Sequence, residues 1–330
     1  MKFILNKKNT IIFLAAIFVF NFSFFSFAEN YSFSDLDLVL LGKGNEAENT
    51  FVIGDGCQSF TEKRTVTQFY LNRFETTYDL WYSIRTAAES LGYTFLNPGQ
   101  EGSFGKRGAS PTENNKFHPV TMISWYDAII WCNAFSELSG FTPCYTFEGK
   151  VLKDATDTSR IDLCECNFDA NGYRLPTETE WEFAARKTKS GFQSGALMSG
   201  QVDKNGKSDS SIPEEEVSWT ANNSTSTHLV GTAGTPWQEN APPKCGSGNP
   251  NASGLFDMSG NVLEYVWDWF SNYKPVLNNE RATGVEFGSE RVSRGGSYSL
   301  YTPFSYAADR YSFTAAECYD YTGFRIAKTK

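Results

Sequence analysis

Histidine is scarce in this chain of 330 residues, which has His118 and His228 and no others. A facial-triad iron site needs two histidines and a carboxylate at one place, and nothing in the sequence brings these two together. No serine lies in a Gly-x-Ser-x-Gly elbow, so serine-nucleophile chemistry has no support either. Two common kinds of catalytic site are therefore not indicated.

Positive charge is also in short supply, with 29 Lys and Arg against 38 Asp and Glu. Removal of residues 1–28 would take away three lysines and no acidic residue, which lowers the formal net charge from −9 to −12. An acidic chain is poorly suited to binding a phosphate backbone. We therefore expect no nucleic-acid partner.

Long apolar runs are missing except near the N-terminus. There, three lysines precede the run Ile11–Phe20, and Ser26-Phe27-Ala28 is a small-x-small cleavage signal. We predict a signal peptide over residues 1–28 and export of the remainder to the periplasm, the cell surface or the medium. The alternative is an uncleaved membrane anchor. It would be the chain's one membrane contact, because no other apolar stretch is long enough to cross a bilayer.

The cysteines are seven in number: Cys57, Cys132, Cys144, Cys164, Cys166, Cys245 and Cys318. Export permits disulfides, and an odd count leaves at least one thiol free or paired with another chain. The Cys-Glu-Cys triplet at residues 164–166 lacks the spacer of a zinc knuckle. We predict one or two disulfides plus buried thiols, with the pairing undetermined.

Capping residues predict where helices begin. Thr77 and Ser124 each precede an amphipathic stretch, and Gly92 and Gly140 would end the two helices. Residues 187–250 are mostly small and polar, which indicates a long irregular region.

A third helix is predicted after Thr177. The acidic run Glu178, Glu180 and Glu182 could be read as carboxylates for acid/base chemistry. Glu180, however, lies three residues after Thr177, which is the spacing of a capping box, and acidic residues stabilise a helix N-terminus. We prefer the capping interpretation.

The stretch Gly254–Phe270 is dense in apolar and aromatic residues and carries Asn261 and Glu264. Two interpretations stay open. Turned backbone, Asn and Glu supply the hard oxygen ligands that calcium uses. Alternatively, the segment is a core strand with a buried, hydrogen-bonded Glu264.

The stretch Arg291–Lys330 opens on Gly295-Gly296 and ends near Phe324-Arg325-Ile326, the pattern of a half-buried last strand. Between these ends lie many Tyr, Phe, Ser and Thr, residue types that favour contact with a ligand. An ordinary aromatic surface loop is the other interpretation.

Several motifs together resemble the formylglycine-generating enzyme, or sulfatase-modifying factor, family. In order, they are NGYRLPTETEWEFAAR, THLVGT, GLFDMSGNVLEYVWDW, RVSRGGSY and TGFRI. The resemblance extends over about Phe51 to Ala327. It implies an α+β fold, a large variant of the C-type lectin-like fold with short sheets and much irregular loop, in a single domain over residues 29–330.

The resemblance also implies what chemistry is absent. Family members that make formylglycine carry two copper-binding cysteines shortly after Gly-Gly-Ser-Tyr, and these positions fall on Leu300 and Ser305 here. Neither residue supplies a thiolate, so we expect no copper and no formylglycine-generating oxidation. The family's calcium segment would place one calcium at Asn261 and Glu264, with the carbonyls of Gly260 and Val262.

Some proteins of this fold are diversified by retroelements and vary between a Gly-Gly-Ser turn and a terminal Gly-Phe-Arg, and the tail here resembles such a region. We therefore expect a non-catalytic, exported, monomeric binding protein for a protein or carbohydrate ligand, with Arg294, Ala308, Arg310 and Arg325 as scaffold. The predicted binding residues are Tyr298, Ser299, Leu300, Tyr301, Thr302, Phe304, Ser305, Tyr306, Tyr311, Phe313, Tyr319, Asp320 and Tyr321. The alternatives are a structural envelope component and an enzyme of unknown reaction on the same fold.

Overall fold

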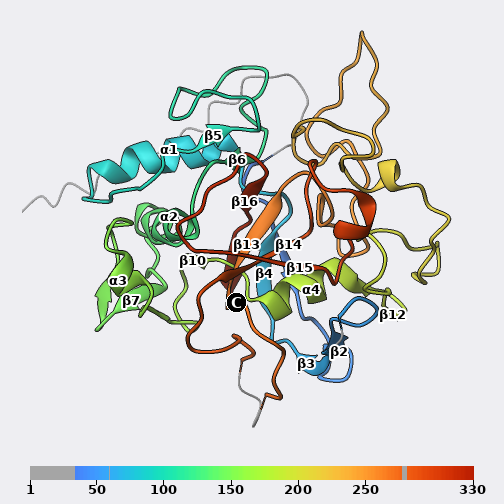
Figure 1. Cartoon of the computed structure of the whole chain (residues 1–330), viewed down its shortest axis with the longest axis horizontal. Helices are drawn as coiled ribbons and strands as arrows, with labels where there is room; N and C mark the ends of the chain where they lie inside the picture. Colours follow the sequence, from blue (N-terminus) through green and yellow to red (C-terminus); the bar gives the residue numbers. More distant parts are fainter. Residues whose placement is uncertain (1–33, 59, 277–280) are drawn as a thin grey trace, which may run out of the picture. The chain divides into compact units, whose positions relative to one another are not determined.

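Two four-stranded sheets organise the protein, and the C-terminal stretch contributes to both. A computed structural model describes residues 34–58, 60–276 and 281–330 (Figure 1). The predicted signal peptide, residues 1–28, lies outside the described residues. In the part of the chain that is described, no helix combines the length and apolar character that crossing a membrane requires.

The first sheet is antiparallel throughout and joins segments that are distant in sequence. Its strands, in spatial order, are β1 (Leu38–Leu41), β4 (Phe69–Asn72), β17 (Ala327–Thr329) and β10 (Tyr173–Arg174).

The second sheet is built mostly from the C-terminal stretch. Its strands, in spatial order, are β15 (Arg310–Phe313), β14 (Arg291–Arg294), β13 (Leu263–Trp269) and β16 (Thr322–Phe324). β13 and β16 are parallel, and the other pairs are antiparallel. β15 is an outer strand of this sheet, which becomes important below.

The first helix, α1 (Tyr78–Glu89), begins where its cap predicts. The Thr77 hydroxyl accepts a hydrogen bond from the Leu80 N–H at 3.3 Å. Gly92, with φ 80°, lies three residues beyond the last helical residue. α3 (Thr158–Ile161) is a single short turn.

The other two predicted starts are also confirmed. Ser124 forms a capping box at α2 (Trp125–Leu138). Thr177 and Glu180 form another at α4 (Glu178–Arg186). Such caps satisfy backbone N–H groups that the first helical turn leaves without partners.

The remaining regular structure consists of short ribbons and two 3-10 turns, joined by long irregular segments as predicted for residues 187–250. They are β2 (Thr50–Ile53), β3 (Glu62–Thr65), β5 (Gln100–Glu101), β6 (Val120–Thr121), β7 (Tyr145–Phe147), β8 (Lys150–Val151), β9 (Glu165–Cys166), β11 (Lys187–Thr188), β12 (Gly191–Phe192), η1 (Glu214–Glu216) and η2 (Thr302–Phe304).

Tryptophan dominates the core. Trp81 of α1 and Trp131 of α2 stack with ring centroids 5.8 Å apart, and Phe324 of β16 packs edge-on against both. A second cluster surrounds the fully buried Trp181 of α4. Aromatic pairs in these geometries add to the stabilisation from burial alone, so β16 is held firmly against the first two helices.

The prediction of disulfides is wrong. Six thiols are free in the described residues: Cys57, Cys132, Cys144, Cys164, Cys166 and Cys318. Burial raises the pKa of each of them, to about 11 for Cys144 and about 12 for Cys57 and Cys164. Cys132, with Cys164 and Cys166 packed against the same cluster, therefore acts as a small apolar core residue, a role that cysteine spacing does not distinguish from cross-linking.

Candidate functional site

The candidate site is the surface formed by residues 298–321 of the C-terminal stretch. It starts at Gly295 and Gly296, whose φ angles of 95° and 72° favour glycine. A Cβ at Gly296 would collide with the side chain of Ser305. The backbone at Gly296 therefore passes too close to Ser305 for any larger residue, which explains the glycine at this position.

The thirteen predicted binding residues do not all reach the surface. Ser305 is fully buried and Tyr298 is 8% exposed, so neither presents a broad face to a ligand. The other eleven are partly or fully exposed: Ser299, Leu300, Tyr301, Thr302, Phe304, Tyr306, Tyr311, Phe313, Tyr319, Asp320 and Tyr321.

We call five partly or fully exposed aromatic residues of this stretch the aromatic face: Phe304, Tyr311, Phe313, Tyr319 and Tyr321. Ring contacts join the last three. The rings of Tyr319 and Tyr321 stack at 5.0 Å, and Phe313 packs against both. The Tyr311 hydroxyl donates to the Phe304 carbonyl at 2.8 Å. Tyr311 and Phe313 are alternate residues of β15 and so share one side of the sheet.

Buried ion pairs hold β14 and β15 against α4. Arg310 donates two hydrogen bonds to the Glu178 carboxylate, at 2.6 and 2.7 Å. Arg294 pairs with Glu182 and also donates to the Asp309 carbonyl. Two-point pairing of this kind fixes orientation as well as distance, so the strand beneath the aromatic face is rigidly placed.

A third ion pair closes the end of the stretch. Arg325 donates to both oxygens of Glu264, at 2.5 and 2.7 Å. The indole N–H of Trp181 donates to the same carboxylate at 2.7 Å. The predicted scaffold roles of Arg294, Arg310 and Arg325 are confirmed.

The partners of those arginines were missed by the sequence reasoning. Glu178 and Glu182 were assigned to the helix N-terminus, yet each holds an arginine of the tail. Their i, i+4 spacing, which puts both on one face of a helix, is the signal that indicates a common partner surface. Glu180 does cap α4, and it also pairs with Arg174 at 2.7 Å.

The two residues of the calcium interpretation both have protein partners. The Asn261 side chain donates to Glu75 at 2.6 Å and accepts from the His228 N–H at 2.9 Å. Glu264 is the buried, hydrogen-bonded strand residue of the second interpretation. Among the described residues, no group of three or more His, Cys, Asp and Glu is placed to hold a metal ion. Calcium at this site stays a prediction.

Three carboxyl groups nonetheless gather around one arginine. Glu75, Asp257 and Glu264 are all buried near Arg325. Burial, followed by repulsion among the acids, raises the pKa of Glu75 well above its usual range. Burial likewise raises the pKa of Asp257 to about 6, and its Oδ1 has no hydrogen-bond partner. One arginine therefore does not neutralise the cluster.

The histidines lie closer together than the sequence indicated. The electrostatic influence of His228 reaches His118, although burial is the main reason why the pKa of His118 is lowered to about 4. Burial lowers the pKa of His228 to about 4 as well. His118 bonds to Thr227 at 3.0 Å, and His228 stacks on Trp219 at 3.7 Å. Both are neutral, partnered residues, as expected for a structural role.

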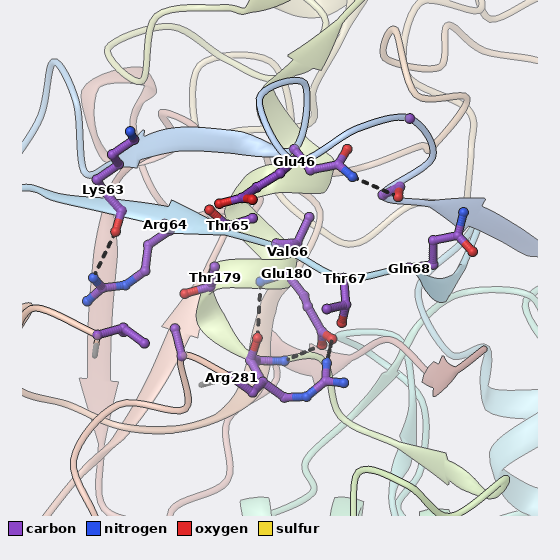
Figure 2. A pocket seen from close by; sticks show the side chains of 16 residues that line it. Glu46, Lys63, Arg64, Thr65, Val66, Thr67, Gln68, Thr179, Glu180 and Arg281 are labelled. Carbon is purple, nitrogen blue, oxygen red and sulfur yellow. Dashed lines mark hydrogen bonds and ion pairs between the residues drawn. The ribbon is translucent and has the colours of Figure 1, made fainter. Parts of the chain in front are cut away.

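Two cavities lie beside β3 and the start of α4, with volumes of about 650 and 330 Å³, and share Arg64 and Arg281. Figure 2 shows the Arg281 guanidinium directed at Glu180 and Arg64 turned to the Lys63 backbone. No residue of the aromatic face lines either cavity.

The smaller cavity reaches a pair of carboxyl groups. Burial and the nearby Glu178 carboxylate raise the pKa of Asp268 to about 8. A protonated acid beside a carboxylate that is ion-paired with Arg310 is a pairing that acid/base chemistry uses. Here, however, Asp268 already accepts the Glu178 N–H at 2.7 Å, which gives it a structural task at the start of α4.

Comparison with known proteins identifies the family. Residues 32–330 match the sulfatase-modifying factor enzyme 1-like domain. The chain belongs to this family. The C-type lectin-like α+β fold expected from the motifs agrees with this membership and with the mixed helices, strands and loops described above.

Two relatives and one solved structure show how broad the family is. The chaperone protein LppX of Paenibacillus barcinonensis is 30% identical over 299 residues, 88% of each chain. The formylglycine-generating enzyme of Mus musculus is 27% identical over 214 residues, which are 64% of this chain and 44% of the mouse protein. Treponema denticola variable protein 1 superposes with a TM-score of 0.66 at 25% identity, over 89% of this chain and 95% of that one. The sulfatase-modifying factor family thus includes both enzymes and a protein named as a chaperone.

Proposed function

We propose that this protein is an exported, non-catalytic member of the sulfatase-modifying factor family that binds a protein partner on its aromatic face. The observation that carries the proposal is the replacement of the family's two copper-binding cysteines by Leu300 and the buried Ser305, within a surface that presents stacked aromatic rings instead. Without thiolates there, neither copper binding nor thiol oxidation has its ligands.

The physical character of the face supports binding. Phe304, which belongs to the aromatic face, is 53% exposed, and Tyr301, at its border, is 62% exposed. Such exposed aromatic groups beside a fixed scaffold are typical of interaction sites. The ordering of the strand by Arg294 and Arg310 lowers the entropy that a partner's binding has to overcome.

A protein is favoured over a carbohydrate as the partner for two reasons. The relative with 30% identity over 88% of both chains is named as a chaperone, a class of protein that binds other proteins. The surface also carries the acidic residues Asp309, Glu317 and Asp320, close to Tyr311, Tyr319 and Tyr321 in turn, and this charge suits a basic polypeptide better than a neutral sugar.

The proposed export is based on the pattern of residues 1–28. The proposed variability of the tail is based on the Gly-Gly-Ser and Gly-Phe-Arg motifs that bound it. We infer that the exposed positions between Tyr298 and Thr322 are the ones that differ between copies of the gene. Sequencing the coding region for residues 293–330 from many cells of one population checks this, and an invariant stretch indicates a fixed partner instead.

Site-specific photo-crosslinking in the cells that export the protein tests the partner. A benzophenone side chain is placed at Tyr319, and a control at Trp237, which is 71% exposed in a distant segment of the chain. We expect one or a few proteins to be captured from Tyr319 and not from Trp237, and capture to be lost when Phe313 and Tyr321 are replaced by serine.

Two other results would point elsewhere. Binding to glycans on an array, with no protein captured from Tyr319, would assign the face to carbohydrate. Oxygen consumption by the copper-loaded protein with a thiol substrate would restore the enzyme alternative and contradict the proposal.

A further inference from the structure

The outer strand of the second sheet has one side without a strand partner. β15 pairs with β14 in continuous register, from Arg310 opposite Arg294 to Phe313 opposite Arg291. It is the first strand in the order β15-β14-β13-β16, and no other strand in the described residues pairs with its second edge. Its backbone N–H and C=O groups on that side are the kind of edge that accepts an additional strand.

The devices that normally block such an edge are not built into β15. The sequence Arg-Tyr-Ser-Phe contains no proline and no lysine, and the pairing with β14 has no bulge. The one arginine, Arg310, is turned inward to Glu178 and does not guard the edge. All four residues are partly exposed.

The shortness of β15, four residues, limits what backbone pairing alone can supply. Side chains must provide the rest, and they are arranged for it. Tyr311 and Phe313 project to the side of the sheet where the aromatic face lies. Arg310 and Ser312 project to the other side, where they bond to Glu178 and Glu290.

The surrounding charge selects the chemistry of the incoming segment. Asp309 precedes β15, and Glu317 follows it four residues after its end. Glu290 lies on the face of the sheet opposite the aromatic face, where it accepts a hydrogen bond from Ser312. The basic group within the strand, Arg310, is neutralised by Glu178. A segment that places apolar side chains on the aromatic face and basic ones toward this acidic border satisfies both requirements.

We propose that β15 pairs with an extended segment of the partner polypeptide in which apolar residues alternate with lysine or arginine. This inference rests on the proposed function, since it names the form in which the partner meets the aromatic face. Strand pairing supplies main-chain affinity, and the alternation supplies selectivity. A sugar has no backbone with which to use such an edge.

The test uses two synthetic probes of eight residues, an alternating lysine–valine peptide and the same peptide with its four central amide nitrogens methylated. Methylation removes the backbone donors and leaves charge and side chains unchanged. Binding of each fluorescent peptide to the mature protein is followed by anisotropy. We expect the unmethylated peptide to bind at least tenfold more tightly.

Matched variants locate the binding. Phe313→Lys puts a positive charge beside the edge and should weaken binding of the unmethylated peptide at least tenfold. Phe60→Lys adds the same charge at a phenylalanine that is 58% exposed elsewhere and should change affinity less than twofold.

If the two peptides bind equally well and Phe313→Lys still abolishes binding of both, strand pairing is overturned and the aromatic face remains a binding site. Failure of both peptides to bind would also overturn it, and the photo-crosslinking result would then decide separately whether the face has a protein partner.

Discussion

The two ends of the C-terminal stretch and its middle differ in what their side chains meet. At the ends, cations are buried: Arg294 and Arg325 pair with carboxylates, and Arg291 lies between the rings of Trp125 and Trp269, at 3.5 and 3.4 Å from their centroids. In the middle, apart from the ion pair of Arg310 with Glu178, aromatic side chains pack against one another at the surface.

Within this one segment, the ends specify the fold and the middle forms the proposed contact surface. The buried charges specify a single arrangement of strands, because an arginine in the interior is tolerated only where its partner is in place. The exposed rings carry no such requirement, and they can change with little effect on folding.

Replacing Arg325 by leucine should have the largest effect. It leaves Glu264 buried without its cation, beside the acids Glu75 and Asp257, and the expected loss is about 3–5 kcal/mol in the free energy of unfolding. Urea denaturation measures it. The matched control is Arg85→Leu, which breaks an ion pair with a Glu89 side chain that is 60% exposed and should cost about 0–1 kcal/mol. Equal losses would contradict the distinction between interior and surface pairs.

Replacing Gly296 by alanine tests the close passage of the turn over Ser305. Gly149 has nearly the same φ, 73° against 72°, but nothing lies near its absent side chain. Gly149→Ala should therefore cost only the left-handed backbone penalty of about 1–2 kcal/mol, and Gly296→Ala should cost more because it adds the collision. Thermal unfolding of the two variants gives the comparison. Equal costs would show that Ser305 moves aside freely.

The acid cluster around Arg325 should make stability depend on pH. The folded pKa of Asp257, about 6, lies above its usual value of 3.8, so the folded protein binds this proton more tightly than the unfolded chain does. The stabilisation is present below about pH 4 and is lost as pH rises through 6, by an amount on the order of 3 kcal/mol.

Asp257→Asn provides the matched measurement for this effect. Asparagine tolerates the φ of 54° at this position. The difference in unfolding free energy between the two proteins should grow from pH 4 to pH 7, measured by urea denaturation at each pH. A constant difference would mean that Asp257 does not take up a proton in this range.

The smallest effect on stability is expected at the stacked pair Tyr319 and Tyr321. Replacing both by serine removes partly exposed contacts and should lower the unfolding free energy by about 1 kcal/mol or less. Partner capture from a crosslinker at Phe313 should be lost at the same time. A destabilisation as large as that of Arg325→Leu would place these rings with the scaffold instead of the contact surface.

Local features of this protein were predictable from sequence, and distant partnerships were not. The caps at Thr77, Ser124 and Thr177 depend on residues within three positions of one another, so spacing alone indicates them. The motifs predicted the family and its fold. In contrast, the partners of Arg294 and Arg310 lie on α4, more than a hundred residues away, and no local sequence pattern predicts them.

The errors have the same origin. Disulfides were predicted because export permits them, yet six of the cysteines are free thiols, of which Cys132 and Cys144 are buried. Nothing in the sequence brought His118 and His228 together, yet the fold makes them electrostatic neighbours. Within the binding stretch, composition did not distinguish the buried Ser305 from its exposed neighbours.

Residues 322–329 supply a strand to each of the two large sheets, since β16 pairs with β13 and β17 lies between β4 and β10. Nearly everything else in the described chain has to be synthesised before either sheet can close. Nascent chains therefore leave the ribosome without a finished core, and such long-range pairing is also slow to form. In the export that we propose, that delay would keep the polypeptide unfolded and competent for passage through a translocation channel.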